Sequence, residues 1–156
     1  QVIATDHCSF DFHGDKQNGK DDFTKCPNGA PGVETRMPIV FSEGVSKGRL
    51  SLNEFAAVTS TNPAKIFGMY PKKGVLAPGS DADIVLMNPD MEVTITKNIL
   101  HENVDYTPYE GIQVKGWPVM TMVRGQAVVE NERLQVPLGF GRYINRKPVK
   151  YTELLK

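Results

Sequence analysis

The sequence predicts an α/β part followed by a β-rich part within 156 residues. Three observations support this prediction. A short apolar stretch at residues 1–4 ends in polar groups, which is typical of the carboxyl end of a buried parallel strand. Helix signals follow between residues 34 and 68. From about residue 72 onward, stretches in which apolar and polar residues alternate with a period of two predict β-strands.

The first element is the expected buried strand at residues 1–4 (Gln-Val-Ile-Ala), which leads into Thr5, Asp6 and His7. A parallel strand needs neighbours on both sides, and the sequence offers no second βα unit. The chain also begins without Met. We therefore expect either that processing removed an N-terminal segment or that the chain is a piece of a longer protein. Residues 11–32 are rich in Gly, Asp, Asn and Pro and predict a long loop, which at this length is usually functional or mobile.

Three helices are expected next. Apolar residues, with a proline early and glycines near the end, predict a helix over residues 34–46. Residues 51–54 (Ser-Leu-Asn-Glu) form a capping-box pattern, which predicts the start of a second helix. Asn62 followed by Pro63 predicts an N-cap and the first position of a third, short helix that ends at Gly68.

The β-rich part contains four strand candidates. Residues 83–87 form an apolar strand candidate, and residues 92–96 alternate with a period of two. Residues 119–123 and 127–129 flank Arg-Gly-Gln at 124–126, and a glycine between two apolar stretches indicates a hairpin.

Composition excludes several classes of protein. Lys and Arg total 18, as do Asp and Glu, so net charge gives no reason to expect nucleic acid or an anionic membrane as partner. No apolar run approaches the roughly 18 residues of a transmembrane helix. Cys8 and Cys26 lack the paired spacing of a structural zinc site, which favours two reduced thiols in a cytoplasmic protein.

Asp6 and His7 stand where a barrel strand would deliver an active site. A carboxylate at that end can bind a metal, orient a water or take its proton. The alternative is an aspartate that caps the next turn, with a hydrogen-bonded histidine beside it. The three histidines show no HxH or HExxH spacing, so we expect His13 to be solvated and His101 to lie at the surface.

A second candidate site is the stretch Pro-Asn-Gly-Ala-Pro-Gly at residues 27–32. Its backbone N–H and C=O groups cannot all pair locally, so some of them could face a small polar ligand. An ordinary turn is the alternative interpretation.

Several segments together carry a family resemblance. They are ATDHC at 4–8, PNG at 27–29, GVETR at 32–36, SEGV at 42–45, TSTNPAKIF at 59–67, YPKKG at 70–74, APGSDADIV at 77–85, GRY at 141–143 and RKP at 146–148. In this order they resemble the C-terminal portion of the D-hydantoinase/dihydropyrimidinase branch of the cyclic amidohydrolase superfamily.

The resemblance implies a fold and a reaction. Residues 1–70 would form the last strand, active-site loop and terminal helices of a metal-dependent (β/α)8 TIM barrel. Residues 71–156 would form the C-terminal part of a small β-sandwich domain and a tail. The family's reaction opens a hydantoin or dihydropyrimidine to an N-carbamoyl amino acid by a metal-bound hydroxide. The resemblance implies two divalent metal ions, of which Zn²⁺ is the usual one.

Two residues match the family's functional positions. Asp6 matches the aspartate that ligates one metal and acts as general base and then general acid. Asn28 matches the asparagine whose main chain holds the amide groups of the substrate ring. The family's HxH pair, carboxylated lysine and two further histidines have no counterpart in this chain. We therefore expect the chain alone to be inactive and to need the N-terminal part of the same enzyme as its partner.

The resemblance leaves alternatives open. Non-catalytic dihydropyrimidinase-related scaffold proteins share much of this pattern and bind cytoskeletal partners, but Asp6 and Asn28 favour the enzyme. Allantoinases and dihydroorotases share the barrel, although TSTNP and the Arg-Tyr segment fit them less well. The tail, with Tyr143, Arg146 and Tyr151, lacks periodicity, so we expect it to reach a neighbouring subunit of a homotetramer.

Overall fold

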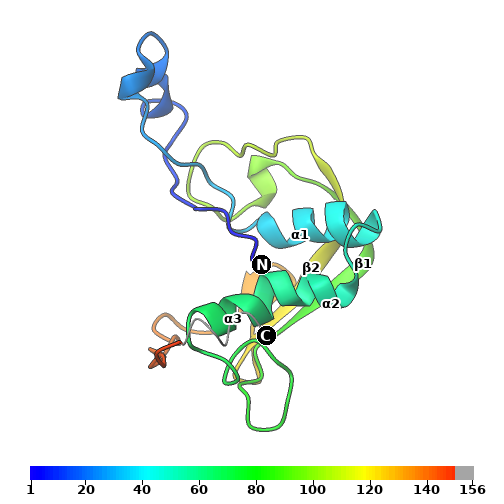
Figure 1. Ribbon diagram of the computed structural model, residues 1–156. Coiled ribbons are helices and arrows are strands. Elements are labelled where there is room, and N and C mark those ends of the chain that lie inside the picture. The colour runs from blue at the N-terminus through cyan, green and yellow to red at the C-terminus, as the bar shows by residue number, and fades with distance from the viewer. Residues whose placement is uncertain (150–156) are drawn as a thin grey trace.

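The computed structural model describes residues 1–149, so the prediction for Tyr151 lies outside the described residues. A four-stranded antiparallel sheet in the order β1-β2-β3-β4 packs beside a helical layer, and an N-terminal arm projects away from both (Figure 1). The helical layer contains α1 (Arg36–Val40), η3 (Phe41–Ser46), α2 (Leu52–Ala56), η4 (Ala57–Thr61) and α3 (Asn62–Ile66). The sheet contains β1 (Ile84–Thr94), β2 (Gln113–Val123), β3 (Gln126–Glu130) and β4 (Arg133–Leu134).

The helix that starts after Ser51 confirms the capping box. The Ser51 hydroxyl accepts the Glu54 N–H at 3.2 Å, and the Glu54 carboxylate accepts the Ser51 N–H at 2.8 Å. These two bonds satisfy backbone donors that the first turn of a helix leaves free.

The expected N-cap at Asn62 is wrong. Its backbone is helical (φ −66°, ψ −44°), because the π-helical segment η4 joins α2 to α3 without a break. The wider turn of a π-helix accommodates Pro63 without ending the helix. The Asn62 side chain instead donates to the Gln1 carbonyl at 2.7 Å. The end of the helix is as expected, since Gly68 (φ +68°) closes a Schellman motif in which the Met69 N–H bonds the Ala64 carbonyl at 2.8 Å.

The two strand candidates at 83–87 and 92–96 belong largely to one strand, β1. Its pairing with β2 is interrupted between Asn88 and Glu92. Pro89 lies in that gap, and proline cannot donate to a ladder. The hairpin between β2 and β3 is confirmed, with Arg124 (φ +52°) and Gly125 (φ +78°) in the two left-handed positions of a tight turn.

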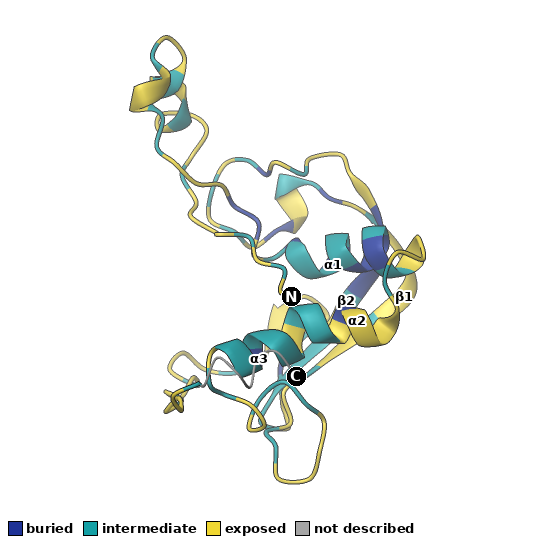
Figure 2. Ribbon diagram, in the orientation of Figure 1, coloured by how far each residue is buried: buried dark blue, intermediate teal, exposed yellow. Residues whose placement is uncertain are grey.

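The core lies between α1, η3 and the face of β2 (Figure 2). Ile95, Leu100, Val114 and Trp117 are buried there together. Next to them, the ring of Phe41 packs edge-on against Phe55, with ring centroids 5.5 Å apart. A Cβ at Gly116 would stand 2.1 Å from Phe41, so a glycine in β2 allows the helical layer to approach the sheet.

Residues 1–4 do not form the expected strand. They have no sheet partner among residues 1–149, and all but Ile3 are exposed. The Ile3 N–H bonds the Val58 carbonyl at 3.2 Å, and the Arg36 guanidinium donates to the Ile3 carbonyl at 3.3 Å. A parallel strand needs parallel neighbours, and the only sheet in the described chain is antiparallel, so residues 1–4 have no strand to pair with.

The segment that was expected to be a loop forms most of the arm, residues 8–30. It carries two short 3₁₀ turns, η1 (Lys16–Gly19) and η2 (Phe23–Lys25). Residues 135–149 contain no helix or strand, as expected for the described part of the tail. The Lys147 N–H bonds the Gly68 carbonyl at 2.9 Å, while Tyr143 is 86% exposed. Across residues 1–149, no helix has the length and apolar character needed to cross a membrane.

Candidate functional site

The base of the arm brings the two predicted site segments side by side. The Cys8 N–H donates to the Ala30 carbonyl at 3.3 Å. Gly29 has a φ of +113°, and a Cβ at this position would lie 2.4 Å from the Cys8 carbonyl oxygen. The segments that carry Asp6 and Asn28 are therefore neighbours at the base of the arm, and both residues are exposed.

Asp6 has an unusual backbone, with a φ of +49°. Aspartate tolerates the left-handed region better than most residues, and such outliers gather at functional sites. No hydrogen bond within residues 1–149 engages its carboxylate, which is free to take a ligand. The same residues contain no group of three His, Cys, Asp or Glu side chains able to hold a metal ion. The described chain thus fits one ligand position and not a complete metal site.

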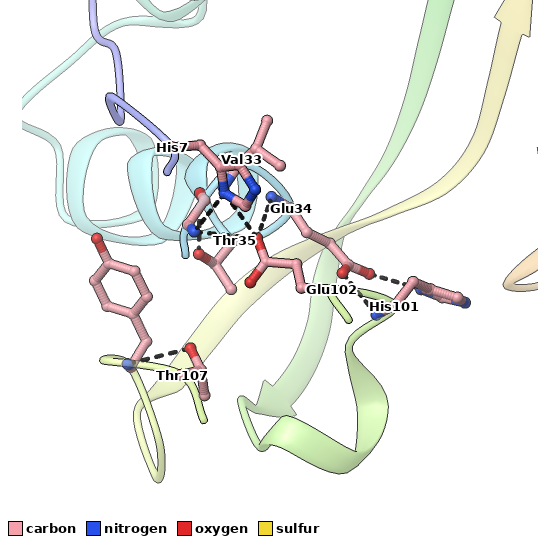
Figure 3. A network of polar contacts seen from close by, with 9 residues as sticks. His7, Val33, Glu34, Thr35, His101, Glu102 and Thr107 are labelled. Atoms are coloured by element: carbon pink, nitrogen blue, oxygen red, sulfur yellow. Dashed lines mark hydrogen bonds and ion pairs between the residues drawn. The ribbon is translucent and has the colours of Figure 1, made fainter. Parts of the chain in front are cut away.

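His7 is held by the turn that follows the arm (Figure 3). Its Nδ1 accepts the N–H of Gly32 at 3.1 Å and the N–H of Val33 at 3.3 Å. An Nδ1 that accepts two backbone donors places the proton of the neutral ring on Nε2. His7 therefore anchors residues 32–33 beside Asp6. The alternative interpretation expected a hydrogen-bonded histidine here, but the turn cap that it assigned to Asp6 is not seen among the described residues.

Glu102 is a site residue that the sequence did not reveal. Its side chain is only 6% exposed. Oε1 accepts the N–H of Gly32 at 3.1 Å and the N–H of Glu34 at 3.2 Å, and it lies 3.6 Å from His7 Nδ1. Oε2 is buried without a partner among the described residues. No local pattern could have found this contact, because the partners are separated by about 70 residues of chain.

Glu34, whose N–H bonds Glu102, also contacts His101, the residue next to Glu102, through its own side chain. Its two oxygens accept the His101 N–H at 2.7 Å and meet the His101 Nδ1 at 2.7 Å. The hydrogen bond and the charge of Glu34 raise the pKa of the His101 ring above its ordinary value of 6.5. His101 does lie at the surface, with a side chain that is 65% exposed, but it is paired there.

An apolar pocket lies away from Asp6 and Asn28. It has a volume of about 380 Å³ and lies over β2 and β3, with Trp117 and Leu134 among its lining. Glu34 and His101 also line it, but no residue of the arm does. The pocket and the predicted site residues therefore occupy different places in the molecule.

A second set of contacts fixes the arm to the body of the molecule. The Asp105 carboxylate accepts the N–H of Phe12 at 2.6 Å and that of His13 at 2.9 Å, and it meets the His13 ring at 2.7 Å. The backbone hydrogen bonds from His13 and Phe12 lower the pKa of Asp105. His13 is 74% exposed, as expected for a loop histidine, yet it has a defined partner.

Comparison with known proteins finds relatives that match nearly the whole chain. The sequence model of the amidohydrolase family matches residues 1–128. A D-hydantoinase from Geobacillus stearothermophilus is 47% identical over 155 residues, which cover 99% of this chain and 32% of that protein. A D-phenylhydantoinase from Escherichia coli is 46% identical over 147 residues, covering 94% of this chain and 32% of that protein. The chain thus spans about a third of the length of the curated relatives it matches.

Solved structures agree with the sequence relatives. The crystal structure of a dihydropyrimidinase from Brevibacillus agri is 51% identical and superposes with a TM-score of 0.93, covering 96% of this chain and 32% of that one. An L-hydantoinase (dihydropyrimidinase) from Arthrobacter aurescens is 43% identical with a TM-score of 0.77, covering 85% of this chain and 29% of that one.

Proposed function

Since the amidohydrolase family model covers residues 1–128, this chain belongs to the amidohydrolase family, and we propose that it is the C-terminal portion of a cyclic amidohydrolase. The proposed substrates are hydantoins or dihydropyrimidines, and the products are N-carbamoyl amino acids. The observation that carries the proposal is the base of the arm, where the segments of Asp6 and Asn28 run side by side with both residues exposed. Relatives named for hydantoin chemistry match the chain almost from end to end.

Asp6 has the central role in the proposed reaction. Its carboxylate takes the proton from the attacking water and gives it to the ring nitrogen that leaves when the C–N bond breaks. The carbonyl carbon becomes the new carboxylate. Divalent metals, when bound, supply a water of lowered pKa, and Asp6 would be one of their ligands. The backbone at Asn28 pairs with the N–H and C=O groups of the ring, so ring shape is recognised without a charge.

The proposal requires ligands from outside this chain. Two divalent ions, which we propose to be Zn²⁺, would need the HxH pair, the carboxylated lysine and the further histidines of the family. The described residues supply no three-ligand set, and we propose that the chain alone is inactive. We further propose a barrel end at residues 1–70, sandwich strands from residue 71 onward, and a cytoplasmic homotetramer.

The alternative is a non-catalytic scaffold protein of the dihydropyrimidinase-related kind. Asp6 argues against it, because a left-handed, exposed carboxylate without a structural hydrogen bond in the described chain contributes nothing evident to folding. The same residue therefore gives the test that separates an enzyme from a binding protein.

The test uses the complete enzyme that carries this chain, with release of the N-carbamoyl amino acid as the assay. Asp6→Asn removes the proton carrier, and we expect turnover to fall at least ~100-fold. Asp21→Asn is the matched control, since Asp21 is also an exposed carboxylate of the arm and makes no described contact. Ring opening by Asp6→Asn at the wild-type rate, or by the purified 156-residue chain with two bound zinc ions, would contradict the proposal.

A further inference from the structure

We propose that Lys16 is a positioning residue that fixes the main chain of Asn28 for the substrate, a role that rests on the proposed function. The Lys16 ammonium donates to the Pro27 carbonyl at 2.5 Å and to the Gly29 carbonyl at 2.5 Å. These two carbonyls stand immediately before and after Asn28. One ammonium group therefore hydrogen-bonds the backbone on both sides of the predicted substrate-binding residue.

The hydrogen bonds from Lys16 leave the backbone N–H and C=O of Asn28 itself available for a ligand. No described residue bonds the N–H or the C=O of Asn28, whereas the carbonyls on either side are turned to Lys16. Hydrogen bonds from a charged donor are about twice as strong as neutral ones, so the ammonium restricts this peptide more than an ordinary turn would. A ring with an imide-like N–H and C=O then meets groups that need little further ordering.

The ammonium is itself held in place. The Lys16 N–H bonds the Asp11 carbonyl at 3.1 Å at the start of η1, and Nζ lies 5.4 Å from the centroid of the Phe10 ring. An ammonium within about 6 Å of a ring face is attracted to it. Lys16 is half-buried, unlike Lys20 at the other end of η1, which is exposed.

The arm has contacts that do not depend on this side chain. Gly19 packs so closely on Cys26 that a Cβ at position 19 would lie 2.4 Å from the Cys26 Cβ. The Asp105 carboxylate separately holds the backbone of Phe12 and His13. Loss of the Lys16 ammonium is therefore expected to loosen the Asn28 peptide without unfolding the arm.

The test compares Lys16→Met, Lys16→Arg and the control Lys20→Met in the complete enzyme. Asn28 would bind the ring in the ground state and in the transition state, so its loosening affects KM more than kcat. We expect Lys16→Met to raise KM ~10-fold, the loss of about one hydrogen bond, with kcat changed less than ~3-fold. Lys16→Arg keeps a cationic donor, so its KM should lie between those of Lys16→Met and wild type. The KM of Lys20→Met should equal that of wild type.

A substrate N-methylated at the imide nitrogen gives a second measurement. It lacks one of the ring donors that Asn28 would read, so the KM penalty of Lys16→Met should shrink with this substrate. An unchanged KM, an equal penalty for both substrates, or a kcat loss accompanied by a lower Tm would overturn the positioning role. A wild-type enzyme that opens no cyclic amide would instead refute the proposed function, and the role of Lys16 would fall with it.

Discussion

Replacing Gly29 with alanine tests whether the close contact at the base of the arm matters for catalysis. Gly29 has a φ of +113°, and the added Cβ would lie 2.4 Å from the Cys8 carbonyl oxygen and 2.7 Å from the Cys8 Cβ. Neither the carbonyl oxygen nor the Cβ is the far end of a flexible side chain, so the backbone has to move. Asn28 precedes Gly29, and Asp6 lies two residues before Cys8, so this movement separates the two segments of the site.

Gly14 supplies the matched control. It belongs to the same arm and has a φ of +100°, but a Cβ there would meet nothing within 4 Å. Both alanine variants pay the strain of a positive φ, about 1–3 kcal/mol. Only Gly29→Ala adds the steric overlap, which costs about 1–3 kcal/mol in a packed site. If the overlap is relieved by displacing the site, this difference lowers kcat/KM of Gly29→Ala by a further ~5- to 150-fold relative to Gly14→Ala.

The assay is kcat/KM of the complete enzyme with a hydantoin or dihydropyrimidine. A displacement of the order of 1 Å in a substrate-holding segment can lower the rate ~100-fold, which agrees with the fold-change estimated from the steric overlap. We expect Gly29→Ala to fall well below Gly14→Ala while both variants keep their metal content. Equal values of kcat/KM for the two variants would refute the reasoning, because the contact with Cys8 would then have no part in placing Asn28.

Two further predictions concern the rest of the fold. Gly116→Ala should lower the free energy of unfolding by about 1–3 kcal/mol more than Gly111→Ala, because a Cβ at 116 overlaps buried Phe41 and one at 111 meets open space. Thermal unfolding of the complete protein measures this difference, and similar Tm values would contradict it. An NMR titration should give His101 a pKa above 6.5 that falls in Glu34→Gln. Because the folded pKa is raised, this pair should stabilise the protein fully below pH 6.5 and lose its effect as pH rises through the folded pKa.

Local signals in the sequence predicted the ends of elements well. The capping box at Ser51, the glycine stop at Gly68 and the turn at Gly125 each depend on contacts within a few residues, so a short pattern is sufficient to identify them. The N-cap at Asn62 failed for a related reason. The pattern Asn-Pro fits the start of a helix, but it also fits the interior of a helix whose preceding turn is wide enough to release the proline.

Contacts between distant parts of the chain could not be predicted. Glu102 reaches the turn at Gly32 across about 70 residues, and Asp105 reaches His13 across about 90. Lys16 is closer in sequence to Pro27, yet nothing in a lysine between loop residues indicates that it will bridge two carbonyls. These residues are fixed by the fold as a whole, and a single sequence carries no signal for them.

The two halves of the proposed site differ in what builds them. The segment around Asn28 is shaped inside this chain, by Lys16, by the approach of Gly29 to Cys8 and by the Cys8–Ala30 hydrogen bond. The carboxylate of Asp6, in contrast, meets no described partner, and its proposed role depends on ligands from elsewhere. The proposed substrate-binding segment is therefore built by contacts within this chain, whereas the proposed metal site needs ligands that the described residues do not supply.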